Sequence, residues 1–295
     1  MNDYRALLRQ VGESESFCYF TDNHLITGRA DADWEVGALD YLARLEALYR
    51  ASGAPFAICG GDWLTSSNEK KSALSMLARI REKAGAMFGE AYFVLGNHDY
   101  NFQMHTEKGT VRSPYELTPE EIAATLFADF GSTYYSFLGK ESRFYVLDSG
   151  IDWNHEALTP HDAQQVHWFL CGLSERDDRH VILVPHMLCI AGERHHPATE
   201  ACARLAAAYN ARESGCYDGT PYDFSKKTGR VELILAGHNH KDTAGRLEGI
   251  PYMTTMAMPT ANGPTVDFIC IDYEKRVLRA VRRGDGESRT LPLLP

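Results

Sequence analysis

The chain has 295 residues, of which 44% are hydrophobic and 24% charged, and this balance predicts a water-soluble globular protein rather than a disordered or fibrous one. Lys and Arg number 30 and Asp and Glu number 40, so the formal net charge of −10 disfavours nucleic acid and membranes as partners. No apolar stretch is long enough for a membrane span or signal peptide, and the 7 cysteines form no C-x-x-C pair. We therefore expect a cytoplasmic protein with reduced cysteines.

Short runs rich in β-branched and aromatic residues predict strands, and apolar residues at helical spacing predict the helices between them. The first helix is predicted over 35–52, with Gly53 just past its end, and a second begins after Asn68. The chain therefore starts in β-α-β-α-β order. The strands predicted before residue 240 are 17–21, 56–59, 92–95, 144–147, 181–184 and 231–235.

Later helices begin where a Thr cap is followed by Pro, at Thr118-Pro119 and Thr159-Pro160, and another begins near Pro197. After His240 the pattern predicts strands at 252–255, 267–271 and 277–281. No linker or repeat divides the chain. We expect one α/β domain over residues 1–295, with parallel βα units first and an antiparallel finish.

Five of the first six predicted strands end in residue types that bind metals. Because the carboxyl ends of parallel strands share one edge of an open sheet, these residues are expected to converge. Glycines just before Asp62, Asn97 and His238 allow the backbone to approach an ion closely. The motifs are T-D-N-H (21–24), G-G-D (60–62), G-N-H-D (96–99), P-H (185–186) and G-H-N-H (237–240).

The candidate ligands are imidazoles, carboxylates and one amide, a nitrogen and oxygen set that suits Mn, Fe or Zn. They exceed what one tetrahedral ion takes, so we expect two divalent ions about 4 Å apart that share a bridging carboxylate. Such a pair lowers the pKa of a bridging water and holds a phosphoryl group during in-line displacement. The site therefore predicts phosphoester hydrolysis.

These five blocks, D-x-H, G-D, G-N-H-D, a lone His and G-H-x-H, occur in an order that resembles the calcineurin-like metallophosphoesterases. The resemblance runs from residue 22 to residue 240. It implies a four-layer α/β/β/α sandwich of two mixed sheets with the metals between the sheet edges. It also implies that the strands after His240 complete the second sheet.

The same resemblance implies a role for each motif residue. His98 would lie beside the substrate phosphate, where it stabilises charge or protonates the leaving oxygen, and Asp99 would help to orient it. The implied reaction is attack of a metal-bridging hydroxide on phosphorus. The implied ligands are Asp22, His24 and His240 for one metal, Asn97, His186 and His238 for the other, and Asp62 as the bridge.

The motifs of this chain differ from those of two branches of the family, and these differences narrow the range of expected substrates. The chain lacks the Arg-Gly that follows the bridging Asp in protein Ser/Thr phosphatases, and Thr65 stands where purple acid phosphatases have a Tyr. What remains resembles the class III cyclic-nucleotide phosphodiesterases and their bacterial relatives. We expect a small phosphodiester or phosphomonoester substrate, such as a cyclic nucleotide. The alternatives are a nuclease, disfavoured by the acidic charge, and a catalytically silent metal-binding scaffold, disfavoured because every ligand is kept.

The stretch 187–230 is a candidate substrate rim, with anion-binding and base-stacking groups in Arg194, His195, Tyr217 and Lys226. A plain surface insertion explains the same stretch equally well.

Other polar groups are assigned structural roles. Asp148-Ser149 follows a predicted strand, and we favour a turn or a role that supports the ligands. His161 and His180 are predicted to be solvated or capping. The basic cluster Lys275, Arg276, Arg279, Arg282 and Arg283 is predicted to form a solvated edge or face.

Overall fold

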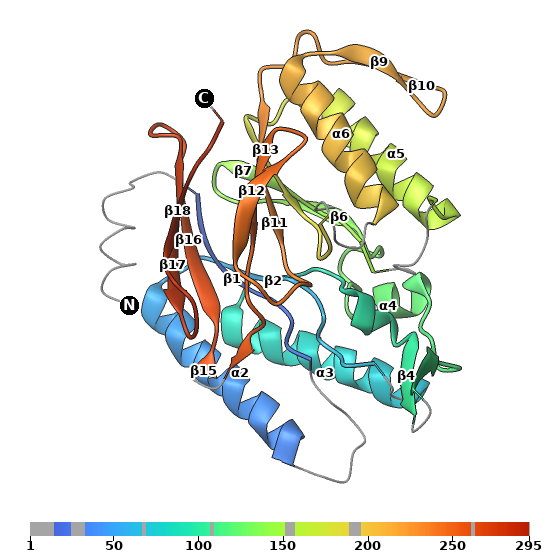
Figure 1. The fold of residues 1–295 in the computed structure, drawn as a ribbon, viewed down its shortest axis with the longest axis vertical. Coiled ribbons are helices and arrows are strands. Elements are labelled where there is room, and N and C mark those ends of the chain that lie inside the picture. Colours follow the sequence, from blue (N-terminus) through green and yellow to red (C-terminus); the bar gives the residue numbers. More distant parts are fainter. Residues whose placement is uncertain are drawn as a thin grey trace.

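The computed structural model describes residues 15–24, 33–66, 69–106, 109–150, 157–188, 196–260 and 263–294. Within these ranges, side chains are described everywhere except at 33–40, 105, 106, 110 and 260. Two six-stranded mixed sheets pack face to face and carry helices on their outer faces (Figure 1). The predicted four-layer α/β/β/α sandwich is confirmed.

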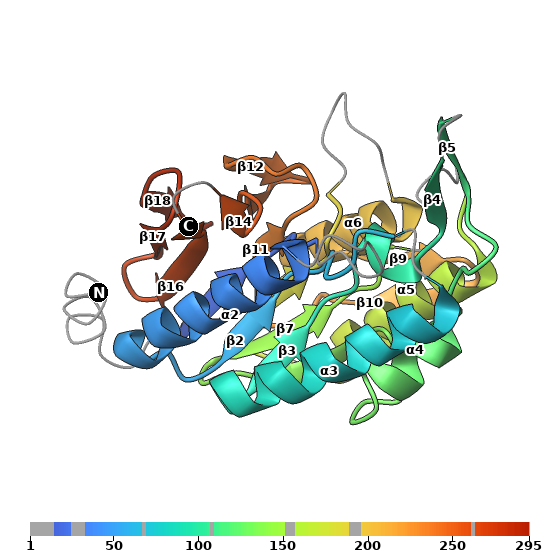
Figure 2. The ribbon, with the colours of Figure 1, turned by 90° about the horizontal axis from the view of Figure 1, so that it is seen from below.

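The first sheet has the order β18-β17-β16-β1-β2-β3. Its strands β1, β2 and β3 run parallel, and β16, β17 and β18 are added antiparallel on the other side of β1. Helices α2 (Asp33–Ser52) and α3 (Lys70–Phe88) connect the parallel strands and cover this sheet (Figure 2). The strands are β1 (Glu15–Phe20), β2 (Ala57–Cys59), β3 (Ala91–Phe93), β16 (Val266–Asp272), β17 (Val277–Arg283) and β18 (Arg289–Pro292).

The second sheet has the order β12-β13-β11-β8-β7-β6. Its four central strands are parallel, and an antiparallel strand closes each side. Helices α5 (Pro160–Glu175) and α6 (Pro197–Ala211) cover its outer face (Figure 1). The strands are β6 (Tyr135–Leu138), β7 (Ser142–Val146), β8 (His180–Val184), β11 (Arg230–Ala236), β12 (Thr243–Leu247) and β13 (Ile250–Thr254).

Smaller elements lie between these layers and at their ends. A short 3₁₀ helix, η1 (Asn97–Tyr100), and helix α4 (Pro119–Thr125) flank the hairpin of β4 (Gln103–Thr106) and β5 (Gly109–Arg112). Two further hairpins join β9 (Ser214–Tyr217) to β10 (Thr220–Asp223), and β14 (Pro259–Thr260) to β15 (Gly263–Pro264). The sequence analysis does not predict these hairpins, β6, β12 or β18, because their short segments contain no continuous run of apolar residues like those that mark the predicted strands.

Both predicted Thr caps form. The Thr159 hydroxyl accepts a hydrogen bond from the Asp162 backbone N–H at 3.1 Å, and the Asp162 carboxylate accepts one from the Thr159 N–H at 2.9 Å. Thr118 and Glu121 make the same reciprocal pair at α4, which ends after seven residues. None of the helices in the described ranges combines the length and apolarity needed to cross a membrane.

The sheets are held together by aromatic side chains from their inner faces. Phe17 of β1 packs edge-on against Phe144 of β7, with ring centroids 5.3 Å apart, and Phe137 of β6 stacks on Phe144 at 4.7 Å. All three rings are buried, and burying one such side chain contributes about 1.5–3 kcal/mol. A second apolar cluster lies between the second sheet and helices α5 and α6. This packing fixes the sheets relative to each other and thus the edge where the motifs meet.

The strands after His240 do not all belong to the second sheet. β12 and β13 do, but β16 pairs antiparallel with β1 of the first sheet and brings β17 and β18 with it. The prediction is therefore wrong for β16 and β17, and β18, which is not predicted, also joins the first sheet. The physical reason is that β1 is buried along its length and needs a hydrogen-bonding neighbour on the side away from β2.

Two predictions of solvated side chains are also wrong. His180 is buried, stacks on Tyr273 with ring centroids 3.6 Å apart, and lies 2.8 Å from Glu232 through Nδ1. Arg282 is buried among carboxylates of both sheets, because its position on β17 faces inward. Sequence pattern cannot reveal such ion pairs, since the partners lie far away in the chain.

Candidate metal centre

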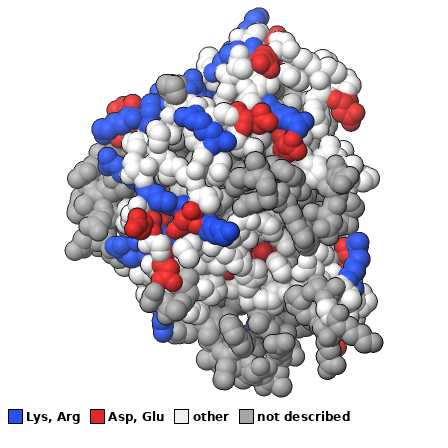
Figure 3. All heavy atoms as spheres, in the orientation of Figure 1, with Lys and Arg blue, Asp and Glu red and all other residues white. Residues whose placement is uncertain are grey.

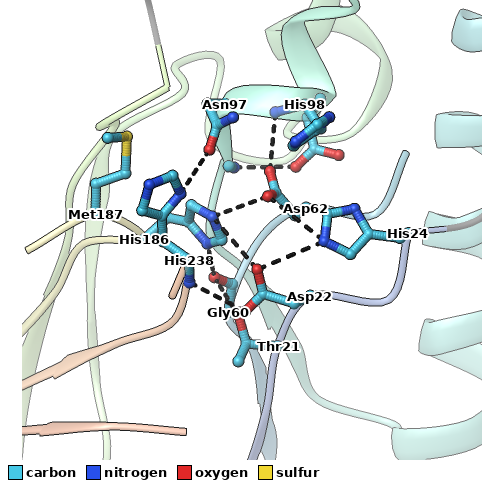
Figure 4. Close-up of polar contacts among 12 residues, drawn as sticks. Thr21, Asp22, His24, Gly60, Asp62, Asn97, His98, His186, Met187 and His238 are labelled. Atoms are coloured by element: carbon cyan, nitrogen blue, oxygen red, sulfur yellow. Dashed lines mark hydrogen bonds and ion pairs between the residues drawn. The ribbon is translucent and has the colours of Figure 1, made fainter. Parts of the chain in front are cut away.

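Five strand ends meet at one edge of the two sheets, as the sequence predicts (Figure 4). The backbone leaves several of these strands in the left-handed region, with φ of 57° at Asp22, 53° at Asp62, 73° at His238 and 53° at His240. Residues with a side chain rarely adopt this region, and such strain gathers at functional sites. The turns point the polar side chains towards one another instead of along the strands.

The first group of candidate ligands consists of Asp22, His24 and His240, whose ligand atoms lie within 4.8 Å of one another. The Nε2 atoms of His24 and His240 are 2.9 Å apart, and His240 Nε2 is 3.3 Å from Asp22 Oδ1. Two imidazole nitrogens and a carboxylate oxygen facing one point are the donors that a divalent transition metal prefers.

The second group consists of Asp62, His186 and His238, again within 4.8 Å. His186 Nε2 lies 3.1 Å from Asp62 Oδ2, and His238 Nδ1 lies 2.9 Å from Asn97 Oδ1. The amide of Asn97 therefore joins this group.

Asp62 lies between the two groups. Its Oδ2 atom is 3.1 Å from His186 Nε2 on one side and 3.9 Å from His24 Nε2 on the other (Figure 4). Its Oδ1 atom accepts the backbone N–H of His98 at 2.9 Å, which fixes the orientation of the carboxylate. One carboxylate thus faces both groups, the arrangement needed to share it between two ions.

Glycines at the strand ends make this close packing possible. A Cβ atom on Gly96 would lie 2.1 Å from Asp62 Oδ1, and one on Gly237 would lie 2.1 Å from Thr21 Oγ1 and 2.6 Å from Asp22 Oδ2. Any side chain at either position would push a candidate ligand out of place.

Orphaned atoms in the cluster fit a metal. The Nδ1 atom of His186 donates to the Gly60 carbonyl at 2.7 Å, so the neutral ring presents its Nε2 lone pair to the cluster. Among the described residues, neither His186 Nε2 nor Asp22 Oδ1 has a hydrogen-bond partner, although both atoms are buried. Buried polar atoms seldom lack partners, and a bound cation would satisfy both.

The charges of the cluster are strongly coupled. Burial alone would raise the pKa of Asp62, but nearby imidazoles, His186 foremost, hold it below its usual range. Burial opposes charging of His186, yet Asp62 and Asp22 raise its pKa to about 10. Burial and the charge of His186 lower the pKa of His238 to about 4. In the metal-free chain a proton on His186 thus balances the two carboxylates, a role that a divalent ion would take over.

The sequence analysis expects Asp99 to orient the His98 ring, but its carboxylate binds backbone groups instead. Its buried carboxylate accepts backbone N–H groups from Trp63 at 2.7 Å, Leu64 at 3.0 Å and Gly96 at 3.0 Å. Burial, together with the charge of Asp62, raises its pKa to about 7. Asp99 therefore ties the loop after β2 to the loop after β3, which positions Asp62 and Asn97 relative to each other.

His98 lies beside the cluster. One of its ring nitrogens falls within 4.8 Å of the ligand atoms of His24 and Asp62, and its ring meets that of His24 edge-on with centroids 5.0 Å apart. The hydroxyl of Ser66 lies 3.2 Å from His98 Nδ1. The sequence analysis misses Ser66, because no motif marks a hydroxyl 32 residues before the histidine.

Behind the cluster, the Asp148-Ser149 pair supports the site as the sequence analysis favours. The Ser149 hydroxyl accepts the backbone N–H groups of His186 and Met187, both at 2.9 Å. The Asp148 carboxylate accepts from Tyr100 at 2.5 Å and Thr133 at 2.6 Å, and His161 Nε2 lies 3.1 Å away. Ser149 thus fixes the loop that carries His186.

Of the four residues of the predicted substrate rim, the structure describes two, and both lie away from the cluster. Arg194 and His195 lie outside the described residues. Tyr217 is on β9, which lies next to α6 on the outer side of the second sheet (Figure 1). There it lines a cavity of about 630 Å³. Lys226 follows β10, and the next residue, Lys227, bonds carbonyl groups at the carboxyl end of α5. That end points away from the cluster, because α5 begins on the side where β7 ends.

Comparison with known proteins places this geometry in context. A family model described as calcineurin-like phosphoesterase matches residues 16–242. No curated protein sequence matches the chain significantly.

Solved structures share the fold. A dimetal phosphatase from Danio rerio superposes with a TM-score of 0.63 at 14% identity, covering 95% of this chain and 99% of its own. GAP50, described as the anchor in the inner membrane complex of Plasmodium, superposes with a TM-score of 0.53 at 11% identity, covering 96% and 89%. At these identities the similarity concerns the fold alone.

Proposed function

Since the chain belongs to the calcineurin-like phosphoesterase family and is a metal-dependent phosphohydrolase, we propose that it hydrolyses a small phosphodiester, or a phosphomonoester, at a centre of two divalent ions. A cyclic nucleotide is the diester class that best suits the motifs. The observation that carries the proposal is the position of Asp62, whose Oδ2 atom faces ligand nitrogens of both groups.

The chain's own residues have separable tasks in this proposal. Asp22, His24 and His240 would hold one ion, Asn97, His186 and His238 the other, and Asp62 would bridge them. When bound, the ions lower the pKa of a water and hold the phosphoryl oxygens in line. His98 stands beside the cluster without being needed as a ligand, so its ring is available to neutralise charge on the phosphoryl group or to pass a proton to the leaving oxygen.

A nuclease is disfavoured by the charge of the surface. Among the described residues on the face shown in Figure 3, acidic side chains lie beside basic ones, whereas a nucleic-acid backbone is bound by basic groups gathered on one face. Arg276 and Arg282 of the basic cluster are also neutralised by Glu232 and by Asp242 and Asp267.

A catalytically silent scaffold is disfavoured by the geometry. The described residues include all seven candidate ligands, which fall into the two groups above, and His98, which lies within 4.8 Å of ligand atoms of His24 and Asp62. A scaffold has no need for a further histidine beside a complete set of ligands.

The test is reconstitution of metal-stripped protein with Mn, Fe or Zn, followed by metal analysis and a screen of aryl monoesters, aryl diesters and cyclic nucleotides. We expect two ions per chain and turnover of a diester. Asp62→Asn should lose at least one ion and abolish turnover, because the shared ligand is weakened.

The matched control is Asp148→Asn, which changes a buried carboxylate outside both ligand groups and should keep both ions. A fully active wild type with a single ion per chain would end the dinuclear proposal, and a loaded protein inactive on the whole panel would end the proposal for small phosphoesters.

A further inference from the structure

The backbone position of His98 brings its ring close to the cluster but does not by itself fix the orientation of the ring. The backbone of His98 is fixed, because it belongs to η1 and its N–H donates to Asp62 at 2.9 Å. Its side chain is partly exposed and still has two rotatable bonds. A proton donor or charge stabiliser must present one defined nitrogen to the phosphoryl group, so something has to fix the ring.

The hydroxyl of Ser66 makes two contacts with this one residue. Ser66 Oγ lies 3.2 Å from His98 Nδ1 and 3.2 Å from the His98 carbonyl oxygen. The carbonyl can only accept, so the hydroxyl proton goes to it and the Ser66 oxygen accepts from Nδ1–H. The contact therefore keeps a proton on Nδ1 whether the ring is neutral or charged, and Nε2 becomes the nitrogen that faces the substrate. In the charged ring Nε2 carries the second proton, which is the one that can stabilise charge or pass to the leaving oxygen.

The backbone conformation at Ser66 indicates that the serine side chain is needed at this position for its contacts. Ser66 is buried and has a φ of 61°, a left-handed conformation that glycine adopts freely and serine rarely does. Strain of this kind persists where the surrounding structure requires the residue. The neighbouring Thr65 hydroxyl turns to the Ser66 carbonyl, at 3.5 Å.

We propose that Ser66 is a positioning residue for His98, whose hydroxyl bridges the carbonyl and the ring of His98 and holds Nε2 towards a phosphoester bound beside Asp62. Asp99, next to His98 in the chain, is committed to the backbone of Gly96, Trp63 and Leu64 and does not supply this contact. A neutral hydroxyl orients the ring without adding a negative charge next to Asp62. The inference rests on the proposed phosphoesterase function for its effect on turnover, but not for the contact itself.

The kinetic test compares Ser66→Ala and Ser66→Gly with the wild type. Both should keep two metals, and both should lose about 10-fold or more in kcat on an alkyl phosphoester, in the range found for residues that orient site groups. The loss should be smaller on a nitrophenyl ester, whose leaving group needs no proton. Ser66→Gly relieves the left-handed strain, so its melting temperature should not fall below that of the wild type.

Two controls separate positioning from a general structural role. Thr65→Val removes the adjacent hydroxyl at similar volume and should leave kcat near the wild-type value. In a His98→Asn background, Ser66→Ala should cost little further activity, because residues that act through one another are not additive. Wild-type kcat in Ser66→Ala, or full additivity of the two changes, would overturn the proposal.

A readout independent of activity is the ¹⁵N spectrum of histidine-labelled, zinc-loaded protein. Neutral His98 should carry its proton on Nδ1 in the wild type and show a mixture of tautomers in Ser66→Ala. A wild type with the proton on Nε2 would overturn the proposal. If the protein hydrolyses no phosphoester, the proposed function fails, while this spectrum still decides whether Ser66 orients His98.

Discussion

Two clusters of carboxylates lie near β1, one around the buried Asp22 and Asp62 and the other around the buried Asp267, and their partners differ in kind. In the first, Asp22 and Asp62 face imidazoles, and Asp22 Oδ1 accepts no hydrogen bond from the part of the chain that the structure describes. In the second, Asp267 and Asp242 accept five hydrogen bonds from Arg282 and Arg289. Guanidinium groups keep their charge at any relevant pH, whereas an imidazole proton gives way to a metal. A buried carboxylate thus marks a ligand site only where its partners are exchangeable and its oxygens incompletely satisfied.

The arginine cluster also connects the two sheets at the metal edge. Asp242 lies two residues after His240, at the end of the loop from β11, while Asp267 is on β16 of the first sheet. Arg282 contacts Asp242 at 2.6 Å and Asp267 at 2.8 Å. The loop that carries His238 and His240 is thereby attached to the sheet that carries Asp22.

The largest effect on stability is expected at the arginine cluster. Arg282→Met should lower the free energy of unfolding by about 3 kcal/mol, the lower end of the cost of breaking a buried ion pair, because Asp267 loses Arg282 and keeps Arg289 as a partner. Urea unfolding of the metal-free protein measures this. Arg279→Met, on the same strand but half-buried, should cost well under 1 kcal/mol. Equal losses in the two variants would show that the cluster has no special structural role.

Metal removal should lower the stability of the protein through the cluster of Asp22 and Asp62, and not through the arginine cluster. A chelator should lower the stability of the wild type by about 2.7 kcal/mol for each ion that had been present at a hundredfold of its Kd. Thermal unfolding with and without metal gives this increment. Asp148→Asn should keep the full increment, and Asp62→Asn should lose part or all of it. If Asp62→Asn gained as much stability from metal as the wild type, Asp62 would not be a bridging ligand.

His98 tests the comparison further, because it lies beside the imidazole partners of Asp22 and Asp62 but is not assigned as a ligand. His98→Asn should retain both metals and lose roughly 100-fold or more in kcat, with a distinctly larger loss on alkyl than on nitrophenyl esters. Steady-state kinetics and metal analysis of the same preparation check this. Equal losses on both esters favour charge stabilisation over proton donation, and a missing metal would make His98 a ligand.

The smallest effect concerns a further buried carboxylate outside both clusters, Asp148, whose partner His161 can also lose its proton. Burial opposes charging of His161, but its contact with Asp148 and the nearby charges of Asp162 and Glu120 raise its pKa, while the pKa of Asp148 is lowered. Stability from this pair is therefore fully present below the ordinary His value of 6.5 and is lost as pH rises through the raised one.

His161→Gln should consequently destabilise the protein more at pH 5.5 than at pH 9, as measured by urea unfolding at each pH. Tyr134 packs against the ring in both states and contributes equally. A loss independent of pH would mean that His161 acts through packing alone.

The sequence by itself determined the succession of the main strands and helices along the chain and the identity of the candidate ligands. Strand periodicity and Thr-Pro caps are local signals, and motifs at the ends of parallel strands must share an edge, so Asp22, Asp62 and His186 could be placed together without coordinates.

Only the tertiary structure decided which polar residues serve which purpose. Asp99 was assigned to its chain neighbour His98, but the backbone N–H groups of a loop 35 residues away bind it instead. Arg282 and Ser66 gave no signal for the same reason, since their partners come from distant segments and are chosen by burial. A buried group takes whichever partner the packing brings within hydrogen-bond distance, and sequence separation does not limit that choice.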